Sequence, residues 1–295
     1  MSLPREILPG QFYMVTRRCT QRQFLLRPDH ATNNAFLYCL ADAAQRCNIA
    51  VLLTCAMSNH HHTIVFDPDG NLPAFTEHFH KLLAKSQNAL RGRWENFWSS
   101  EQVCVVRLVE PADVMAKLVY VATNPVKDRL VDKVHHWPGV NGLAALLSGR
   151  TLVATRPHHF FRPTGPMPES VALTLALPPA LGDTQQRLAE LRARVAEVEA
   201  AVAADRLRTG AGVLGRQAVR RQSWRACPTR HEPRRNLRPR LAAGNQWARI
   251  EAILRNREFL AAYREARTGW LAGLAIGFPR GTYWLRRFVH VPIAS

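Results

Sequence analysis

The chain has 295 residues, and 47% of them are hydrophobic, which is enough for a packed core and excludes wholesale disorder. The net charge of +18 is concentrated near the end, because residues 206–295 contain 19 arginines, no lysine and four acidic residues. Such a segment repels itself unless a polyanion neutralises it, so nucleic acid is the expected partner. The apolar stretch 171–181 is too short to cross a bilayer, and no membrane association is expected.

Strands and helices alternate in the first half of the chain, and each is bounded by turn or capping residues. Only Ser58 and Asn59 separate two of the strands, which indicates an antiparallel hairpin. The order predicts an α+β fold, an antiparallel sheet covered by helices. The predicted strands are 11–20, 49–57, 60–66 and 103–109, and the predicted helices are 32–47, 72–91 and 111 to 123 or 124, ending before Pro125.

The second half is expected to be mainly helical and basic. Residues 150–179 are Pro-rich and irregular, and residues 184–208 form a charged helix that could be an arm, a linker helix or a helical hairpin. A further helix is expected at 246–267. We therefore divide the chain into a domain at 1–165, a Pro-rich linker with its charged helix at 166–210, and a nucleic-acid-binding region at 211–295.

Aromatic residues alternate with arginines in the last part of the chain. These aromatic residues could stack on unpaired bases, or they could form the core of a small helical domain whose arginines are solvated. For most of the aromatic residues we favour the core interpretation. These aromatic residues are Trp224, Trp247, Trp270, Tyr283 and Trp284. A loop nearby is the expected phosphate-binding segment through Arg234, Arg235, Arg238 and Arg240.

The six cysteines form no C-x-x-C pair, and most lie inside apolar runs. This pattern indicates reduced, buried thiols and a cytoplasmic protein. The first six residues contain no apolar leader segment, so no signal peptide is expected.

His60 and His62 are two residues apart in a predicted strand, so their side chains point to the same face. Two neighbouring imidazoles can bind a divalent metal, although surface or core histidines would give the same pattern. His61 points to the opposite face and should not join them. A polar ring on that buried face needs a hydrogen-bond partner.

Tyr120 lies on a narrow polar stripe of the predicted helix that begins at Pro111. With 100° per residue, Lys117 and Asn124 fall on the same stripe, one turn before and one turn after it. The tyrosine could be a residue at the edge of the core with a solvated hydroxyl. It could also be a nucleophile, with Lys117 holding a phosphate and Asn124 reaching a metal.

Together, the two segments resemble a known family. Residues 57–62 read MSNHHH and residues 120–131 read YVATNPVKDRLV. They are similar to the Met-Pro-Asn-His-hydrophobic-His and Tyr-Ile-x-x-Asn-Pro-Val-Arg-Ala-Gly-Leu-Val motifs of REP-associated tyrosine transposases, which are single-tyrosine HUH transposases. The resemblance covers roughly residues 8–150. The chain departs from it at Ser58, His61 and Asp128-Arg129, none of which replaces a catalytic group.

The resemblance implies a ferredoxin-like HUH endonuclease core and a DNA transposase that cuts single-stranded or hairpin DNA. Tyr120 would form a 5′-phosphotyrosine link, while His60, His62 and Asn124 would hold Mg²⁺ or Mn²⁺. Such a protein would be bacterial, cytoplasmic and nucleoid-associated, and it could be a monomer or a homodimer. Expected DNA contacts in this half are Lys117, Lys81, Lys85, Arg17 and Arg18.

Three other interpretations share some of these residues. A histidine-triad hydrolase would need a third histidine where Ile64 stands. A zinc site could combine His60 and His62 with Cys55 or Cys104. A domesticated, catalytically inactive protein could retain only its grip on DNA or RNA, and the basic C-terminal region supports that alternative.

Overall fold

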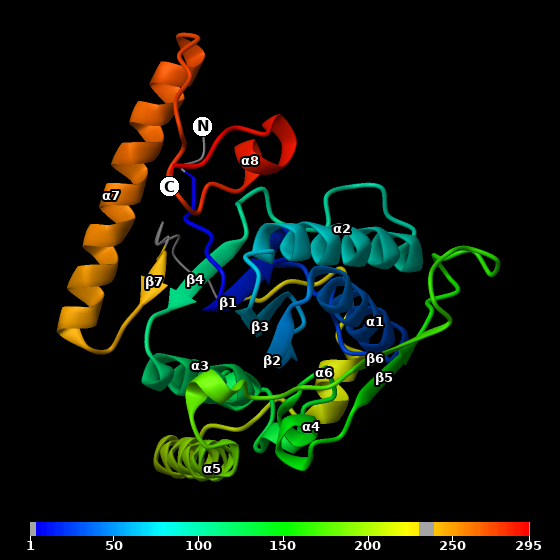
Figure 1. Cartoon of the computed structure of the whole chain (residues 1–295). Coiled ribbons are helices and arrows are strands. Elements are labelled where there is room, and N and C mark those ends of the chain that lie inside the picture. The colour runs from blue at the N-terminus through cyan, green and yellow to red at the C-terminus, as the bar shows by residue number, and fades with distance from the viewer. Residues whose placement is uncertain (1–3, 230–238, 295) are drawn as a thin grey trace.

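The computed structural model describes residues 4–229 and 239–294 (Figure 1). In that part of the chain the strands are β1 Gln11–Arg18, β2 Ala50–Ala56, β3 His60–Asp67, β4 Cys104–Leu108, β5 Leu152–Thr155, β6 Ser170–Leu173 and β7 Leu241–Ala242. The α-helices are α1 His30–Cys47, α2 Leu72–Arg91, α3 Pro111–Lys127, α4 Leu143–Ser148, α5 Thr184–Thr209, α6 Arg216–Arg221, α7 Gln246–Leu271 and α8 Trp284–Val289.

The main sheet has the strand order β2-β3-β1-β4-β7. The pairs β2–β3, β3–β1 and β1–β4 are antiparallel, and β7 adds to the edge in parallel with β4. The chain order β1-α1-β2-β3-α2-β4 with this arrangement is ferredoxin-like. The predicted α+β fold, with a mainly helical C-terminal region after it, is therefore confirmed.

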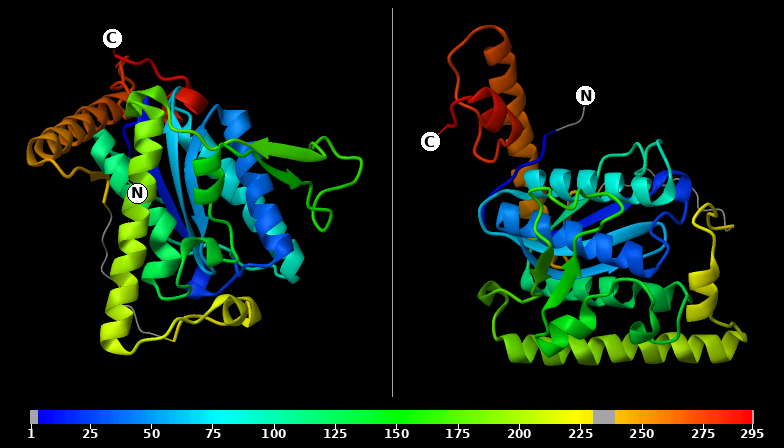
Figure 2. Two further views of the ribbon diagram at one scale, coloured as in Figure 1. Left: turned by 90° about the horizontal axis from the view of Figure 1, so that it is seen from below. Right: turned by 90° about the vertical axis from the view of Figure 1, so that its right-hand side faces the viewer.

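Helices cover both faces of the main sheet. Helices α1 and α2 pack together on one face, while α3 packs on the other face against β2, β3 and β4. Helix α5 lies along the outer side of α3, as the right-hand view of Figure 2 shows. It is one continuous helix, so the charged segment does not form a helical hairpin.

The tight turn between β3 and α2 is built around Asp67. Its buried carboxylate accepts hydrogen bonds of 2.8 Å from the backbone N–H groups of Gly70, Asn71 and Leu72. The Asn71 and Leu72 donors lie at the start of α2, where a helix leaves N–H groups unsatisfied, so the same carboxylate closes the turn and supports the start of α2. Helix α2 ends at Arg91 and is capped by Gly92, whose φ of 59° is the left-handed conformation that glycine adopts readily.

Helix α3 does not end before Pro125, and that prediction is wrong. Pro125 lies inside the helix, which continues to Lys127, and the N–H of Asp128 still bonds to the carbonyl of Asn124 at 3.0 Å. A proline removes one backbone donor, and here the buried side chains of Pro125 and Val126 offset that loss by packing into the core. The extension places Lys127 on α3, two turns after Tyr120.

The later segments contact the main sheet and its helices. The N–H of Gly244, between β7 and α7, donates to the Asp113 carboxylate of α3 at 2.7 Å. The segment expected to be irregular, 150–179, instead contains the antiparallel pair β5–β6, which lies against α1. In the described ranges, no helix combines the length and the apolarity that a membrane span requires.

Candidate active site

Strand β3 places two of its three histidines on the face that α3 covers. The ring centroids of His60 and His62 are 4.8 Å apart. On the neighbouring strand β1, Arg18 lies opposite His60 and Thr16 lies opposite His62. The sheet therefore brings together two imidazoles, a guanidinium and a hydroxyl at the start of β3.

Hydrogen bonds at Nδ1 fix the orientation of both rings. The Nδ1 atom of His60 lies 2.7 Å from Oδ1 of Asn59, and the Nδ1 atom of His62 lies 2.7 Å from Oγ1 of Thr16. The Nε2 atom of His62 is buried and has no hydrogen-bond partner among the described residues. A buried polar atom without a partner is rare in folded proteins, and binding a metal would satisfy this one.

Burial also sets the protonation state of the pair. Desolvation lowers the pKa of His60 to about 4, with a smaller contribution from Arg18. Desolvation lowers the pKa of His62 well below its usual value, and the neighbouring His60 adds to this effect. Both rings are therefore neutral near pH 7, the form that a metal ligand requires, so the residues present fit a divalent metal.

Tyr120 faces this pair from α3. Its ring centroid lies 5.3 Å from that of His62, with the two planes at 71°. Burial raises the pKa of the Tyr120 phenol, and Asp128 adds to the rise. The nearby side chain of Asn124 and the charge of Arg18 lower that pKa in part. The phenol is thus protonated at neutral pH, and nearby positive charge favours its ionisation.

Two lysines on α3 flank the tyrosine ring. The Nζ atom of Lys117 lies 5.7 Å from the Tyr120 centroid, and that of Lys127 lies 5.6 Å from it. We predicted Lys117 from its place on the polar stripe. Lys127 was missed because the helix was expected to end before Pro125. Both ammonium groups are placed to attract an anion beside the phenol.

His61 lies on the other face of the sheet, as the strand alternation predicted. Its ring is fully buried, and its Nε2 atom lies 2.9 Å from Nε2 of His80 on α2, while its Nδ1 atom lies 3.1 Å from Oγ1 of Thr63. The rings of Phe36, Phe79 and Trp98 surround it. His61 has the partner that a buried polar ring needs, so it is a structural residue of the core.

The predicted site residues fall into separate locations. Arg18, Lys117, Tyr120 and Asn124 lie with the histidine pair. Arg17 shares the face of His61, and its guanidinium stacks 5.4 Å from the Trp98 ring. Two exposed lysines, Lys81 and Lys85, belong to α2 on that same side of the sheet. Arg234, Arg235 and Arg238 lie outside the described residues.

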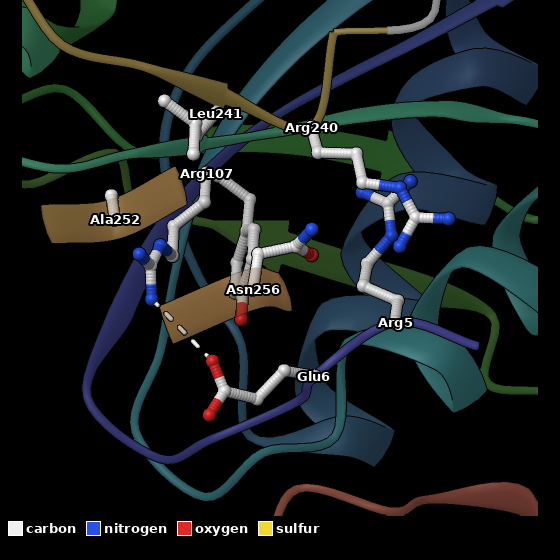
Figure 3. Close-up of a pocket in the computed structure, with 8 residues that line it drawn as sticks. Arg5, Glu6, Arg107, Arg240, Leu241, Ala252 and Asn256 are labelled. Atoms are coloured by element: carbon white, nitrogen blue, oxygen red, sulfur yellow. Dashed lines mark ion pairs between the residues drawn. The ribbon is translucent and has the colours of Figure 1, made fainter. Parts of the chain in front are cut away.

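Arg240 lies at the edge of the sheet, beside β7. Its guanidinium donates to the carbonyl of Pro4 at 2.8 Å and lines a cavity of ≈ 30 Å³ with Arg5 and Asn256 (Figure 3). The close-up shows Arg107 paired with Glu6 on the other side of this cavity. The contacts of Arg240 join the N-terminal segment to the β4–β7 edge, away from the histidine pair.

The aromatic residues of the C-terminal region differ in exposure. Trp270 packs against the buried Phe278, as expected for a small core. Trp247 is 78% exposed and Trp284 is 46% exposed, so neither is a core residue. Trp224 is half-buried against the main core and has arginines around it.

The zinc alternative gains no support from the geometry. Cys55 lies opposite His62 on β2, but its sulfur accepts a hydrogen bond from the Asn141 amide at 3.7 Å. In the described ranges, no group of three or more histidine, cysteine, aspartate or glutamate residues is arranged to hold a metal. A metal at the histidine pair would need another kind of third ligand, such as an amide oxygen.

No protein-family model and no curated protein matches the chain. The structure is similar to that of a REP-associated tyrosine transposase bound to a REP hairpin, with 16% identity and a TM-score of 0.43, over 50% of this chain and 86% of that one. It is also similar to a candidate transposase from Deinococcus radiodurans R1, with 15% identity and a TM-score of 0.30, over 40% of this chain and 93% of that one. Both are described as transposases, the class that the motifs resemble. The chemistry of this site rests on its own residues.

Proposed function

We propose that this protein is a transposase that cleaves and rejoins single-stranded DNA. One observation carries the proposal: the unpartnered, buried Nε2 atom of His62 belongs to an imidazole pair that faces the phenol of Tyr120. In this proposal Tyr120 is the nucleophile, and His60, His62 and Asn124 hold Mg²⁺ or Mn²⁺. Bound there, the metal would polarise the scissile phosphate and offset its developing charge.

The chain's own residues supply the remaining chemistry. The Tyr120 oxygen attacks phosphorus, the bond from phosphorus to the 3′ oxygen breaks, and a 5′-phosphotyrosine forms. The phenol proton leaves to water, and the departing 3′ oxygen takes up a proton to become a free hydroxyl. Lys117, Lys127 and Arg18 stabilise the negative charge that gathers on the phenol oxygen and the phosphate.

Attack by another 3′ hydroxyl on the phosphotyrosine would reverse these steps. The new phosphodiester replaces the phosphotyrosine bond, so rejoining needs no ATP. One tyrosine per site suits cleavage of one strand at a time. The basic C-terminal region would hold single-stranded or hairpin DNA, with the protein acting as a monomer or a homodimer.

The test is a covalent adduct between protein and DNA. Labelled single-stranded hairpin DNA is incubated with the protein and Mg²⁺ or Mn²⁺, and adducts that survive SDS are separated by electrophoresis. We expect an adduct with the unmodified chain and none with Tyr120→Phe. The matched control is Tyr263→Phe, which removes a hydroxyl on α7, and it should form the adduct normally.

An adduct that persists in Tyr120→Phe would exclude Tyr120 as the nucleophile. The absence of any adduct across a panel of hairpin substrates, together with retained DNA binding, would favour a protein that only binds nucleic acid.

A further inference from the structure

Two segments distant in sequence meet beyond the end of the sheet where β3 begins. The N–H of Phe24, in the loop after β1, donates to the carbonyl of Ala226 at 2.9 Å, and Arg27 donates to the carbonyl of Gln222 at 3.3 Å. The right-hand view of Figure 2 shows the segment after α6, in yellow, running beside this blue loop. Part of the C-terminal half thus lies against the catalytic half.

Trp224 lies at this junction with three guanidinium groups around its ring. The Cζ atoms of Arg91, Arg93 and Arg225 lie 5.8, 6.0 and 5.0 Å from the indole centroid. Arginine–aromatic contacts of this kind are attractive, so the indole holds together groups that would otherwise repel one another. The result is a concentration of positive charge fixed in place before any ligand binds.

Neighbouring groups neutralise only part of that charge. Asp29 pairs with Arg91 at 3.4 Å and with Arg27 at 2.9 Å, so one carboxylate serves two arginines. Arg93 donates to neutral acceptors, the side chain of Gln23 and the carbonyl of Asn96, and its buried Nε has no partner among the described residues. An anion would complement this surface.

The next residue, Trp94, is 96% exposed. Proteins that bind single-stranded nucleic acid combine exposed aromatic rings with positive charges. A base stacks on the ring, and its phosphate contacts the arginine. An acidic protein would use the arginines and leave the indole in water. Nucleic acid therefore fits the surface better than an acidic protein does.

Asn59 connects this surface to the candidate active site. Its Oδ1 atom contacts Nδ1 of His60, and its Nδ2 atom donates to the carbonyl of Arg22 at 3.2 Å. Gln21 and Arg22 have φ values of 49° and 58°, a left-handed conformation that is strained for residues other than glycine. Asn59 therefore links the strained loop of Gln21 and Arg22 to His60, and this loop lies between the arginine surface and the candidate active site.

We propose that Arg91, Arg93, Trp94, Trp224 and Arg225 form a subsite for unpaired DNA next to the cleavage site. This inference rests on the proposed function and names a surface that guides the strand to Tyr120. Phosphates contact Arg93 and Arg225, and a base stacks on Trp94. Segment 222–226 supplies two of the five residues, which gives the C-terminal half a role at the cleavage site.

Binding is measured in the Tyr120→Phe background, where cleavage cannot interfere, by fluorescence anisotropy of labelled oligothymidine across a salt series. Arg93→Gln should reduce the slope of log affinity against log salt by about 0.7, the value for one phosphate contact with a single strand. Trp94→Ala should weaken binding by about 5- to 150-fold, the range for one stacked base. Melting followed by circular dichroism confirms that each variant is folded.

Arg192→Gln and Leu207→Ala on α5 are the matched controls, since both residues are exposed and neither belongs to the subsite. Folded variants that bind within about twofold of these controls, with an unchanged salt slope, would overturn the subsite. Equal affinity for a duplex of the same length would overturn the assignment to unpaired DNA. The binding measurement needs no cleavage. A failed adduct test therefore does not overturn the subsite, and a failed binding test does not overturn Tyr120 as the nucleophile.

Discussion

Strand β3 has histidines on both of its faces, and the contacts of these histidines differ between the two faces. On one face His61 is fully buried, and His80, Thr63 and three aromatic rings surround it. On the other face His62 is hydrogen-bonded at Nδ1 and unpartnered at Nε2 within the described part of the chain. Burial alone does not distinguish His62 from His61, since both rings are buried. His62 differs because its Nε2 atom has no partner and its ring faces the phenol of Tyr120.

The largest expected effect is on the ligand face. His62→Gln keeps much of the side-chain volume and removes the imidazole, so adduct formation should slow by at least about a hundredfold, equivalent to several kcal/mol of lost charge stabilisation. Single-turnover adduct formation with Mn²⁺ measures this rate. His158→Gln, at a histidine whose side chain is 64% exposed, is the control. Equal rates for the two variants would remove His62 from the site.

Substitution of His61, on the opposite face of β3, should reduce the stability of the fold and leave the rate of adduct formation unchanged. His61→Ala leaves a cavity and an unpaired Nε2 atom on His80, so the free energy of unfolding should fall by about 3 kcal/mol. Urea denaturation measures it. The double variant His61→Leu/His80→Leu should recover much of that loss, since no buried polar ring is left without its partner. A marked drop in the adduct rate of the folded double variant would contradict the separation of the two faces.

Loss of the hydroxyl that orients the His62 ring is expected to have a smaller effect than loss of the ring. Thr16→Val is close in shape and removes the hydroxyl that contacts Nδ1 of His62, so Mn²⁺ affinity should weaken by about 10- to 100-fold. Isothermal titration calorimetry with Mn²⁺ gives the affinity. Thr63→Val, on the His61 face, should leave it unchanged. If both variants bind Mn²⁺ as the unmodified chain does, Thr16 does not orient a ligand.

The smallest effect is expected at the lysines that flank Tyr120. Lys127→Gln removes an ammonium group near the ring. Because Lys127 is exposed and its charge is screened by solvent, the adduct rate should fall by only about threefold to tenfold. The effect should shrink as salt is raised. An equal rate at low salt in Lys127→Gln and the unmodified chain would show that this ammonium does not act on the phenol.

Much of the structure of the first half of the chain follows from local sequence patterns. The bounds of α2 were predicted without error, because Asp67-Pro68-Asp69-Gly70 and Gly92 mark both of its ends. The placement of His60, His61 and His62 follows from strand alternation alone. The polar stripe through Lys117, Tyr120 and Asn124 follows from helical periodicity.

The features that the sequence did not predict depend on contacts between residues distant in the chain. Strand β7 has two residues, and its pairing with β4 has no local signal. The hairpin of β5 and β6 forms against α1 inside a Pro-rich stretch. Helix α3 continues through Pro125 because the buried packing of that turn outweighs one lost hydrogen bond. The contact of Thr16 with His62 requires the register of β1 against β3, which one sequence does not supply.

The most direct test of the central claim is to locate the DNA attachment by mass spectrometry. After reaction with hairpin DNA and Mn²⁺, nuclease and trypsin digestion should leave a nucleotide on the peptide of residues 118–127, LVYVATNPVK, in which Tyr120 is the only tyrosine. We predict a 5′-nucleotide linked to Tyr120, and at least about a hundredfold less of it in the His62→Gln sample after the same short reaction time. A nucleotide on any other peptide, or an unmodified 118–127 peptide from an isolated adduct, would contradict the claim that Tyr120 and the histidine pair form one active site.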